Sequence, residues 1–263
     1  MLLVLDIGNT NTVLGLYNIS SPVRPLVGKW RITSLDRTVD ETGLLLKNLL
    51  QLHDVCDGDI RGVVLSSVVP RLEETWSLAL KAYIDAPTYI VANDADLGIG
   101  IDMDNPAEVG ADRLVNSVAA VEKYGCPLIT VDLGTAITLD VVSKDRNYIG
   151  GAIAPGLSVS VETLFSRTAR LPQIPLTAPK RAIGRNTKHA IQSGIVYGYA
   201  GLLDALVERI WGELGVKTKV VATGGHAEII AGNSRTITDI EPWLTLDGLL
   251  ILYYRLSGQS HGK

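Results

Sequence analysis

The chain begins with Leu2-Leu-Val-Leu-Asp6-Ile-Gly8-Asn-Thr-Asn-Thr12, and a related stretch, Leu128-Ile-Thr-Val-Asp132-Leu-Gly134-Thr-Ala-Ile-Thr138, opens its second half. Each copy is an apolar run followed by the pattern Asp-x-Gly-x-x-x-Thr, which predicts a β-strand that ends in a glycine turn. An acidic side chain, hydroxyl groups and backbone N–H groups then project from the end of each strand. We expect the two turns to grip a metal-bound polyphosphate from two sides.

Composition sets the broad class of the protein. The 263 residues are 46% hydrophobic and 20% charged, with a net charge of −4, which is typical of a compact globular protein without a basic surface for nucleic acid. Cys56 and Cys126 stand far apart with no Cys or His at ligand spacing, so we expect two reduced core residues rather than a zinc site or disulfide. No basic leader precedes Asp6, and no apolar stretch suggests a membrane span, so the sequence predicts a soluble, cytoplasmic protein.

The hydrophobic pattern predicts a unit of strand, hairpin and helix that occurs twice. The first unit has predicted strands at 2–5, 13–17, 29–33, 62–69 and 88–91 and helices at 39–53 and 71–83. A helix at 114–122 leads to the second unit, with strands at 128–131, 139–142, 148–154 and 219–221 and helices at about 187–213 and 242–257.

This repeated plan predicts an α/β protein of two lobes, each resembling a ribonuclease H-like unit, with a cleft between the two Asp-bearing turns. We place the boundary in the link between helix and strand at Lys123-Tyr-Gly-Cys. The expected lobes are therefore residues 1–124 and residues 125–263.

The first turn has the residues of a phosphate-binding loop. Gly8 permits a tight turn, and Asp6 can hold a magnesium ion directly or through water. The sequence has no P-loop lysine at this turn, so a Walker-type site is excluded. An Asx-rich hairpin turn without a ligand is the alternative, although two matched copies favour function. The expected side-chain donors to phosphate are Asn9, Thr10, Asn11 and Thr12.

The second turn supplies another carboxylate, Asp132, as a candidate cation ligand, and Thr135 can contact a terminal phosphate. The alternative is an aspartate that only caps the turn. A carboxylate that follows an apolar strand is costly to bury, however, unless an ion or hydrogen-bond donors satisfy it.

A third segment, Asn105-Pro-Ala-Glu-Val-Gly-Ala-Asp-Arg113, lies between the two copies. Gly110 allows the backbone to approach a ligand closely. Asp112 can accept a hydroxyl proton and Arg113 can clamp an anionic group, since both head the helix predicted at 114–122. Solvated helix charges are the alternative interpretation.

Together these motifs resemble type III pantothenate kinase, of the acetokinase, sugar kinase, Hsp70 and actin superfamily, almost from end to end. The resemblance implies ATP-dependent phosphorylation of pantothenate to 4'-phosphopantothenate, the first step of coenzyme A biosynthesis. The motifs that carry it are Asp6-Ile-Gly-Asn-Thr-Asn-Thr12, Asn105-Pro-x-x-Val-Gly-Ala-Asp-Arg113, Asp132-Leu-Gly-Thr-Ala-x-Thr138, Gly150-Gly-x-Ile-x-Pro-Gly156 and Gly184-Arg-Asn-Thr187.

The resemblance also implies roles for individual residues. Asp112 is the expected proton acceptor, and Thr135 contacts ATP. Asp132 is the expected ligand of a monovalent cation, K⁺ or NH₄⁺, and Asp6 of Mg²⁺. Met103 stands where many relatives have an aromatic residue, and it can pack against the dimethyl group of the substrate. The expected ATP contacts are Asp6, Ile7, Gly8, Asn9, Thr10, Asn11, Thr12 and Val13, and the expected pantothenate contacts are Gly110, Ala111, Asp112 and Arg113.

Thr187 matches a family threonine that completes the site of the neighbouring subunit, so a homodimer is expected. Independently, Gly194, Gly198 and Gly201 lie three to four residues apart on the predicted helix and open one face for close helix approach. Packing of that face within one chain is the alternative.

Two other functions remain open at this point. A different small-molecule kinase or a phosphatase on the same fold would share the phosphate motifs, and the Gly110–Arg113 segment distinguishes it. The second open function is that of a non-catalytic regulator that binds nucleotide or a transcription factor. A regulator would be expected to lack one of the catalytic acids, but Asp6, Asp112 and Asp132 are all present.

The segment Ala222-Thr-Gly-Gly-His226 resembles the glycine turn near adenosine in this superfamily.

Overall fold

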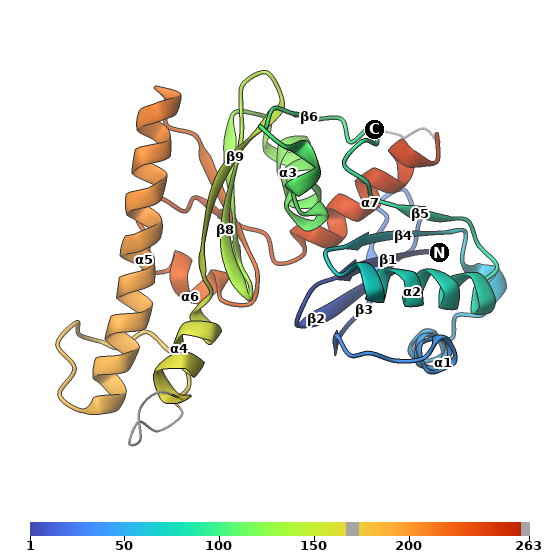
Figure 1. The fold of residues 1–263 in the computed structure, drawn as a ribbon, viewed down its shortest axis with the longest axis horizontal. Helices are drawn as coiled ribbons and strands as arrows, with labels where there is room; N and C mark the ends of the chain where they lie inside the picture. The colour runs from blue at the N-terminus through green and yellow to red at the C-terminus, as the bar shows by residue number, and fades with distance from the viewer. Residues whose placement is uncertain (167–173, 259–263) are drawn as a thin grey trace. The chain divides into compact units, whose positions relative to one another are not determined.

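The computed structural model describes residues 1–166 and 174–258, and it contains two mixed β-sheets with helices (Figure 1). The predicted α/β class is confirmed. The chain divides into two compact units: unit 1 comprises Met1–Gly100, Asp104–Ala119 and Leu244–Lys263, and unit 2 comprises Ile101–Met103 and Ala120–Trp243.

The sheet of unit 1 has the strand order β3-β2-β1-β4-β5. Its central strand β1 pairs antiparallel with β2 and parallel with β4, so Asp6 lies beside Val13 on one side and Ser66 on the other. The strands are β1 (Leu2–Ile7), β2 (Asn11–Tyr17), β3 (Leu26–Thr33), β4 (Gly62–Ser67) and β5 (Thr88–Ile90).

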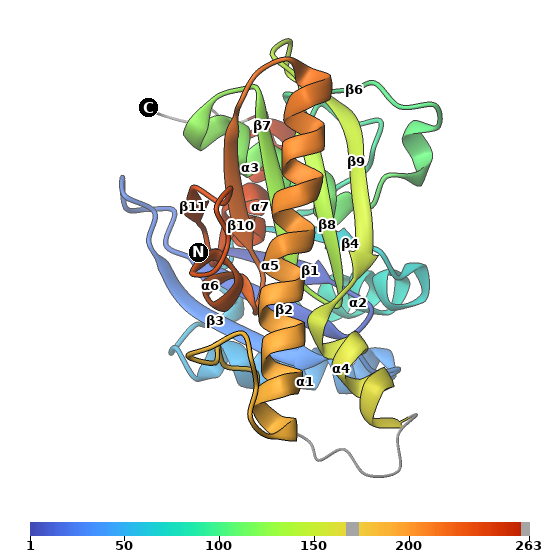
Figure 2. The same ribbon diagram turned by 90° about the vertical axis from the view of Figure 1, so that its left-hand side faces the viewer.

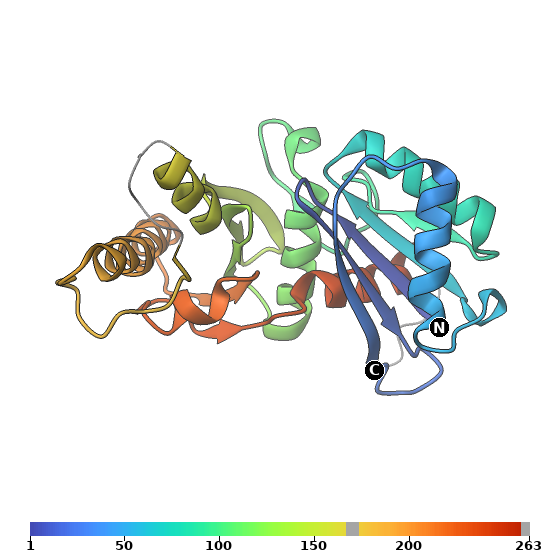
Figure 3. The same cartoon turned by 90° about the horizontal axis from the view of Figure 1, so that it is seen from below.

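Helices α1 (Val39–Gln51) and α2 (Pro70–Tyr83) cover one face of this sheet, where Leu3, Leu5 and Ile7 enter a core cluster with helix residues (Figures 1 and 3). Thr38 caps α1 in a reciprocal pair with Glu41. The opposite face receives α7 (Leu244–Leu256). A Cβ on Gly62 would lie 2.5 Å from Tyr253 Cε2, so a glycine is needed for this close approach.

The sheet of unit 2 has the order β11-β10-β7-β8-β9-β6. The order β9-β8-β7-β10-β11 within it repeats that of unit 1, which supports the repeat seen in the sequence. Figure 2 shows α5 (Thr187–Leu214) lying across this sheet, and its apolar residues join the second core cluster. The other elements are β6 (Gly100–Ile101), β7 (Leu128–Leu133), β8 (Ala136–Val142), β9 (Asn147–Pro155), β10 (Lys219–Thr223), β11 (Asp239–Ile240), α4 (Leu157–Ser166) and α6 (Ala227–Ala231).

The compact units divide the chain differently from the predicted lobes 1–124 and 125–263. Helix α3 (Ala111–Tyr124) begins in unit 1 and ends in unit 2. Helix α7 comes last in the chain but belongs to unit 1, since its apolar face packs on β1, β2 and β4. The division into lobes 1–124 and 125–263, which follows the repeat in the sequence, therefore stays a prediction.

The predicted strands and helices match observed elements, whereas α4, α6, β6, β11 and two short 3₁₀ turns, Asp57–Asp59 and Pro106–Glu108, were not predicted. The expectation that both cysteines lie in the core is wrong. Cys56 is exposed and Cys126 is partly buried, because each lies in a surface connection rather than on a strand.

Helix α5 also corrects an expectation. In the described residues it is the one helix that is long and apolar enough to cross a membrane, with 28 residues and a mean hydropathy of 1.3 in its most apolar window. Its buried residues include Val196 and Leu203 in the core cluster, and the buried polar residues Gln192 and Asp204 have protein partners. We therefore interpret α5 as a core helix of unit 2.

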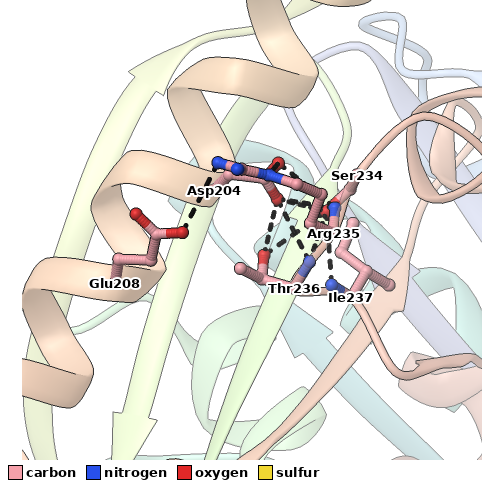
Figure 4. Close-up of polar contacts among 6 residues, drawn as sticks. All are labelled: Asp204, Glu208, Ser234, Arg235, Thr236 and Ile237. Carbon is pink, nitrogen blue, oxygen red and sulfur yellow. Dashed lines mark hydrogen bonds and ion pairs between the residues drawn. The ribbon is translucent and has the colours of Figure 1, made fainter.

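Asp204 anchors α5 to the loop between α6 and β11 (Figure 4). Its side chain is almost fully buried and accepts hydrogen bonds from Ser234 Oγ at 2.6 Å and Thr236 Oγ1 at 2.9 Å. The backbone N–H and the guanidinium of Arg235 also donate to it. Burial alone would raise the pKa of Asp204, but these hydrogen bonds outweigh burial and hold the pKa below its usual value.

We expect Asp204→Asn to lower the free energy of unfolding by about 2–4 kcal/mol. The amide NH₂ of asparagine would face the hydroxyl and N–H donors of the loop, which need an acceptor. Since the folded pKa is depressed, this contribution is present above the ordinary aspartate pKa of about 3.9 and is lost as the pH falls through the folded value. Urea unfolding at pH 7 and pH 3.5 measures both effects.

Glu208→Gln is the matched control, because its exposed carboxylate contacts the same arginine at 3.4 Å. We expect a loss of less than about 1 kcal/mol. Equal losses in the two variants would contradict the role of Asp204 as the buried anchor.

Candidate active site

In unit 1, Asp6 stands at the end of β1 and is partly exposed. Ser66 Oγ, on the neighbouring strand β4, donates to Asp6 Oδ1 at 2.7 Å. The backbone N–H of Gly8 donates to the carbonyl of Asn11 at 3.0 Å and closes the turn, in which Asn9 and Thr10 are exposed. The carboxylate is therefore held in place beside a turn with accessible polar groups.

Ser34, which directly follows β3, holds this turn. Its Oγ donates to the Gly8 carbonyl at 2.7 Å and lies 2.9 Å from Thr12 Oγ1. Because a hydroxyl has one proton, Thr12 must be the donor to Ser34. Thr12 is 1% exposed and its hydroxyl holds the shape of the turn through Ser34, so its expected contact with phosphate stays a prediction.

Two other residues expected to contact ATP, Ile7 and Val13, have apolar side chains. Ile7 is fully buried in the core cluster, and Val13 is half-buried. Only their backbone groups are suited to the contact that the resemblance implies.

The Gly110–Arg113 segment lies at the same edge of the sheet. Val68 follows β4, and its N–H donates to the carbonyl of Ile7 at 3.1 Å. A Cβ on Gly110 would lie 3.4 Å from Val68 Cγ1 and 2.5 Å from Asp112 Oδ1. Gly110 therefore leaves room for the Asp112 carboxylate near the strand end that carries Asp6.

Asp112 lies in the first turn of α3, next to the buried Ala111. Its Oδ1 accepts the backbone N–H of Arg113 at 2.8 Å. Burial raises the pKa of Asp112, and the hydrogen bond and the charge of Arg113 offset this only in part. A carboxylate with a raised pKa binds a proton more readily, as a general base requires.

In unit 2, Asp132 stands at the end of β7 against two glycine turns. A Cβ on Gly224 would lie 2.6 Å from Asp132 Oδ1, and one on Gly134 would lie 3.2 Å from it. Gly224 also has a φ of +93°, which L side chains rarely adopt. A side chain at either position would fill the space that the carboxylate occupies.

A third glycine brings Thr135 into the same group. The N–H of Gly156 donates to the carbonyl of Thr135 at 3.1 Å, and a Cβ on Gly156 would lie 2.1 Å from that oxygen. Helix α4 starts at the next residue, and Thr135 itself is exposed. The turns after β7, β9 and β10 therefore converge around Asp132 and Thr135.

Both carboxylates fit the cations that the resemblance implies. Mg²⁺ and K⁺ prefer oxygen ligands, and Mg²⁺ retains several waters in most protein sites. Asp6 is partly exposed and fixed by Ser66, which suits a magnesium ion bound directly or through water. Asp132 lies in a cradle of glycine backbone, where carbonyl and carboxylate oxygens are close together.

The remaining predicted residues lie in unit 2. Met103 Sδ would be 3.2 Å from a Cβ on Gly150, which has a φ of +110°. Thr187 is the exposed first residue of α5, after the N-cap Asn186. His226 precedes α6; its Nδ1 is buried without a hydrogen-bond partner among the described residues, and its Nε2 lies 3.5 Å from Ser158 Oγ.

Three supporting residues were missed by the sequence analysis: Ser34, Ser66 and Asn93. The Asn93 amide donates to the carbonyls of Pro106 and Val109, both at 2.8 Å, and so holds the segment that leads to Asp112. Ser66 offered a signal, since it is the first polar residue of an apolar strand. Ser34 and Asn93 offered none, because their partners are distant in the sequence.

Comparison with known proteins gives a consistent result. The family model described as type III pantothenate kinase matches residues 2–209. A type III pantothenate kinase from Koribacter versatilis is 45% identical over 274 residues, covering 100% of each chain. One from Bacillus cytotoxicus is 42% identical over 264 residues, covering 100% of this chain and 99% of that protein.

Two solved structures share the fold. A protein from Campylobacter jejuni described as a Baf family transcriptional activator has a TM-score of 0.60 at 19% identity, covering 97% of this chain and 99% of that one. The ethanolamine utilization protein EutJ from Carboxydothermus hydrogenoformans has a TM-score of 0.54 at 11% identity, covering 94% and 87%. At these identities the likeness concerns the fold alone.

We expect Gly224→Ala to lower the free energy of unfolding by about 2–4 kcal/mol, because the added Cβ meets the Leu133 backbone and the residue has a positive φ. Urea unfolding measures this loss. Gly212→Ala on the exposed side of α5 is the control, and we expect it to raise stability by up to about 1 kcal/mol. A Gly224→Ala protein as stable as wild type would contradict the packed glycine cradle.

Proposed function

The chain belongs to the type III pantothenate kinase family, and we propose how its residues carry out the reaction. The enzyme transfers the γ-phosphoryl group of ATP to pantothenate in coenzyme A biosynthesis. The observation that carries the proposed mechanism is the placement of Asp112, with its raised pKa, at the sheet edge that holds Asp6.

The turn after β1 binds the ATP phosphates. The turn presents backbone N–H groups and the exposed side chains of Asn9 and Thr10, which suit phosphate oxygens. Asp6, oriented by Ser66, holds Mg²⁺ directly or through water. When bound, Mg²⁺ neutralises charge on the phosphates. Ser34 keeps the turn in the required shape through the Gly8 carbonyl.

Asp112 is the catalytic base. The primary hydroxyl oxygen of pantothenate forms a bond to the γ-phosphorus while the bond from that phosphorus to the ADP oxygen breaks. The hydroxyl proton passes to a carboxylate oxygen of Asp112. In a loose phosphoryl-transfer transition state the proton leaves late, so positioning matters more than basicity.

Neighbouring residues hold pantothenate. Gly110 and Ala111 let the backbone approach the substrate, and Arg113 binds its carboxylate. Met103 supplies an apolar contact for the dimethyl group in place of an aromatic ring. Support for these roles comes from the motif and from the room that Gly110 leaves beside Asp112.

The converging turns of unit 2 bind the other ATP groups. Thr135 is exposed and contacts phosphate, and Asp132 binds the monovalent cation, K⁺ or NH₄⁺. The glycine cradle around Asp132 supports this role, since Gly134 and Gly224 let the backbone approach its carboxylate closely.

We further propose a homodimer in which Thr187 completes the partner's site. Helix α5 supports this, because only 33% of its most apolar window is buried within the chain. Gly194, Gly198 and Gly201 are exposed on it, with open space where each Cβ would be. A second copy of α5 would cover this apolar, small-residue face.

The chain is a soluble metabolic kinase. We propose that it acts in the cytoplasm, where ATP is available to it.

We expect Asp112→Asn to lower kcat by about 10²–10⁴-fold, because an amide cannot accept the proton. In the wild type, kcat/KM should fall as the pH drops through the pKa of Asp112. Since burial raises that pKa, the fall should begin at a higher pH than for an ordinary aspartate. An ADP-release assay with ATP, Mg²⁺, K⁺ and pantothenate, with product confirmed by mass, measures both.

Glu108→Gln is the control for charge in the same segment, since this exposed carboxylate accepts a hydrogen bond from the Asn105 amide at 2.8 Å. We expect its kcat to stay within about twofold of wild type. Retention of wild-type kcat by Asp112→Asn would exclude Asp112 as the base.

Mixing two inactive variants tests the shared site. If Thr187 acts in the partner's site, then Thr187→Arg mixed with Asp112→Asn produces heterodimers with one intact site. Random exchange should restore about a quarter of wild-type activity, because half the dimers are mixed and each has one of two sites intact. No recovery after subunit exchange, confirmed by native mass spectrometry, would place Thr187 in its own chain's site.

A further inference from the structure

The two Asp-x-Gly-x-x-x-Thr motifs have the same spacing but different hairpin registers. In unit 1, Ile7 is opposite Thr12, and Asp6 is opposite Val13. In unit 2, Asp132 is opposite Thr138. A shift of one residue moves a side chain to the other face of a sheet.

This shift gives the two threonines different surroundings. Thr12 shares the face of the core residue Ile7 and is 1% exposed. Thr138 shares the face of Asp132, and residues directly opposite in an antiparallel pair have Cβ atoms about 4.5–5.5 Å apart. Across the hairpin, the second copy therefore places a hydroxyl opposite its strand-end carboxylate, where the first copy places Val13.

A buried carboxylate fixes the direction of the Thr138 proton. Thr138 Oγ1 donates to Asp140 Oδ2 at 2.8 Å, and Tyr148 OH donates to Asp140 Oδ1 at 2.8 Å. Asp140 is fully buried, so it retains these partners in preference to water. The single Thr138 proton is therefore directed to Asp140, and its oxygen can offer only lone pairs elsewhere.

We propose that Thr138 is an oxygen ligand of the monovalent cation at Asp132, and that Asp140 is the positioning residue that keeps the Thr138 proton turned away. This inference rests on the proposed cation site. A Thr138 proton directed at Asp132 would occupy the carboxylate that the cation needs. With the Thr138 hydroxyl proton donated to Asp140, the Thr138 oxygen and the Asp132 carboxylate both face the site as acceptors, which suits K⁺ and NH₄⁺ alike.

The variants for the test are Thr138→Val, which removes the oxygen, Thr138→Ser, which keeps it, and Asp140→Asn. Thr130→Val is the matched control. Thr130 lies on the same sheet face, directly opposite Asp140, and its buried hydroxyl has no hydrogen-bond partner among the described residues. Thr130→Val therefore makes the same substitution next to the same carboxylate, Asp140, but removes no hydrogen bond to it.

Two readouts are needed. The first is the K⁺ concentration that gives half-maximal pantothenate phosphorylation, with choline chloride holding ionic strength constant. The second is the rise in melting temperature that KCl produces over choline chloride when a non-hydrolysable ATP analogue is bound. The second readout needs no turnover.

For Thr138→Val we expect the half-saturating K⁺ concentration to rise about tenfold or more and the KCl-dependent melting shift to shrink. Asp140→Asn should move both readouts in the same direction. Thr138→Ser should stay within about threefold of wild type, and Thr130→Val should match wild type.

Several results would overturn the inference. Wild-type K⁺ dependence in Thr138→Val would exclude Thr138 as a ligand. An equal change in Thr130→Val would show that the effect is structural. If the wild type responds to no monovalent cation in either readout, the proposed cation site itself fails, and the inference fails with it.

Discussion

A carboxylate at the end of a buried strand loses part of the water that would solvate it, and the protein or a ligand must supply the missing partners. The chain meets this constraint twice at equivalent places in its two sheets. Asp6 accepts a hydrogen bond from the Ser66 hydroxyl on the adjacent parallel strand, and Asp132 lies against glycine turns. The surrounding turns, their serines and their glycines are arranged around these two groups, which is why they also form the candidate binding surfaces.

The sequence predicted the repeated strands and most helices because apolar periodicity and the glycine turns are local signals. It did not predict that α7 packs in unit 1, since that depends on the room left by Gly62 and Gly15 on distant strands. For the same reason Ser34 was missed: its bond to the Gly8 carbonyl joins residues 26 positions apart. The three acids could be predicted because they belong to sequence motifs. Ser34, which holds the turn beside Asp6 in place, belongs to no motif and could not be predicted.

Equal spacing in sequence did not give equal structure. The turn after Ile7 holds four residues and the turn after Leu133 holds three, as the strand pairs Ile7–Thr12 and Leu133–Ile137 show. Because side chains alternate along a strand, this single residue sends Thr12 toward the core and Thr138 toward Asp132. Hairpin register follows from turn geometry and side-chain burial together, and a motif of fixed spacing does not contain it.

Two aspartates, one fully buried and one partly buried, show how hydrogen-bond partners decide the role of a carboxylate. Asp204 accepts bonds from Ser234, Thr236 and Arg235, and its pKa falls below the usual range despite burial. Asp112 has the Arg113 N–H as a partner, and burial prevails, so its pKa rises. The first is therefore a fixed anion suited to anchoring a helix. The second retains affinity for a proton, and Gly110 keeps the space beside it open, so the same carboxylate becomes a base.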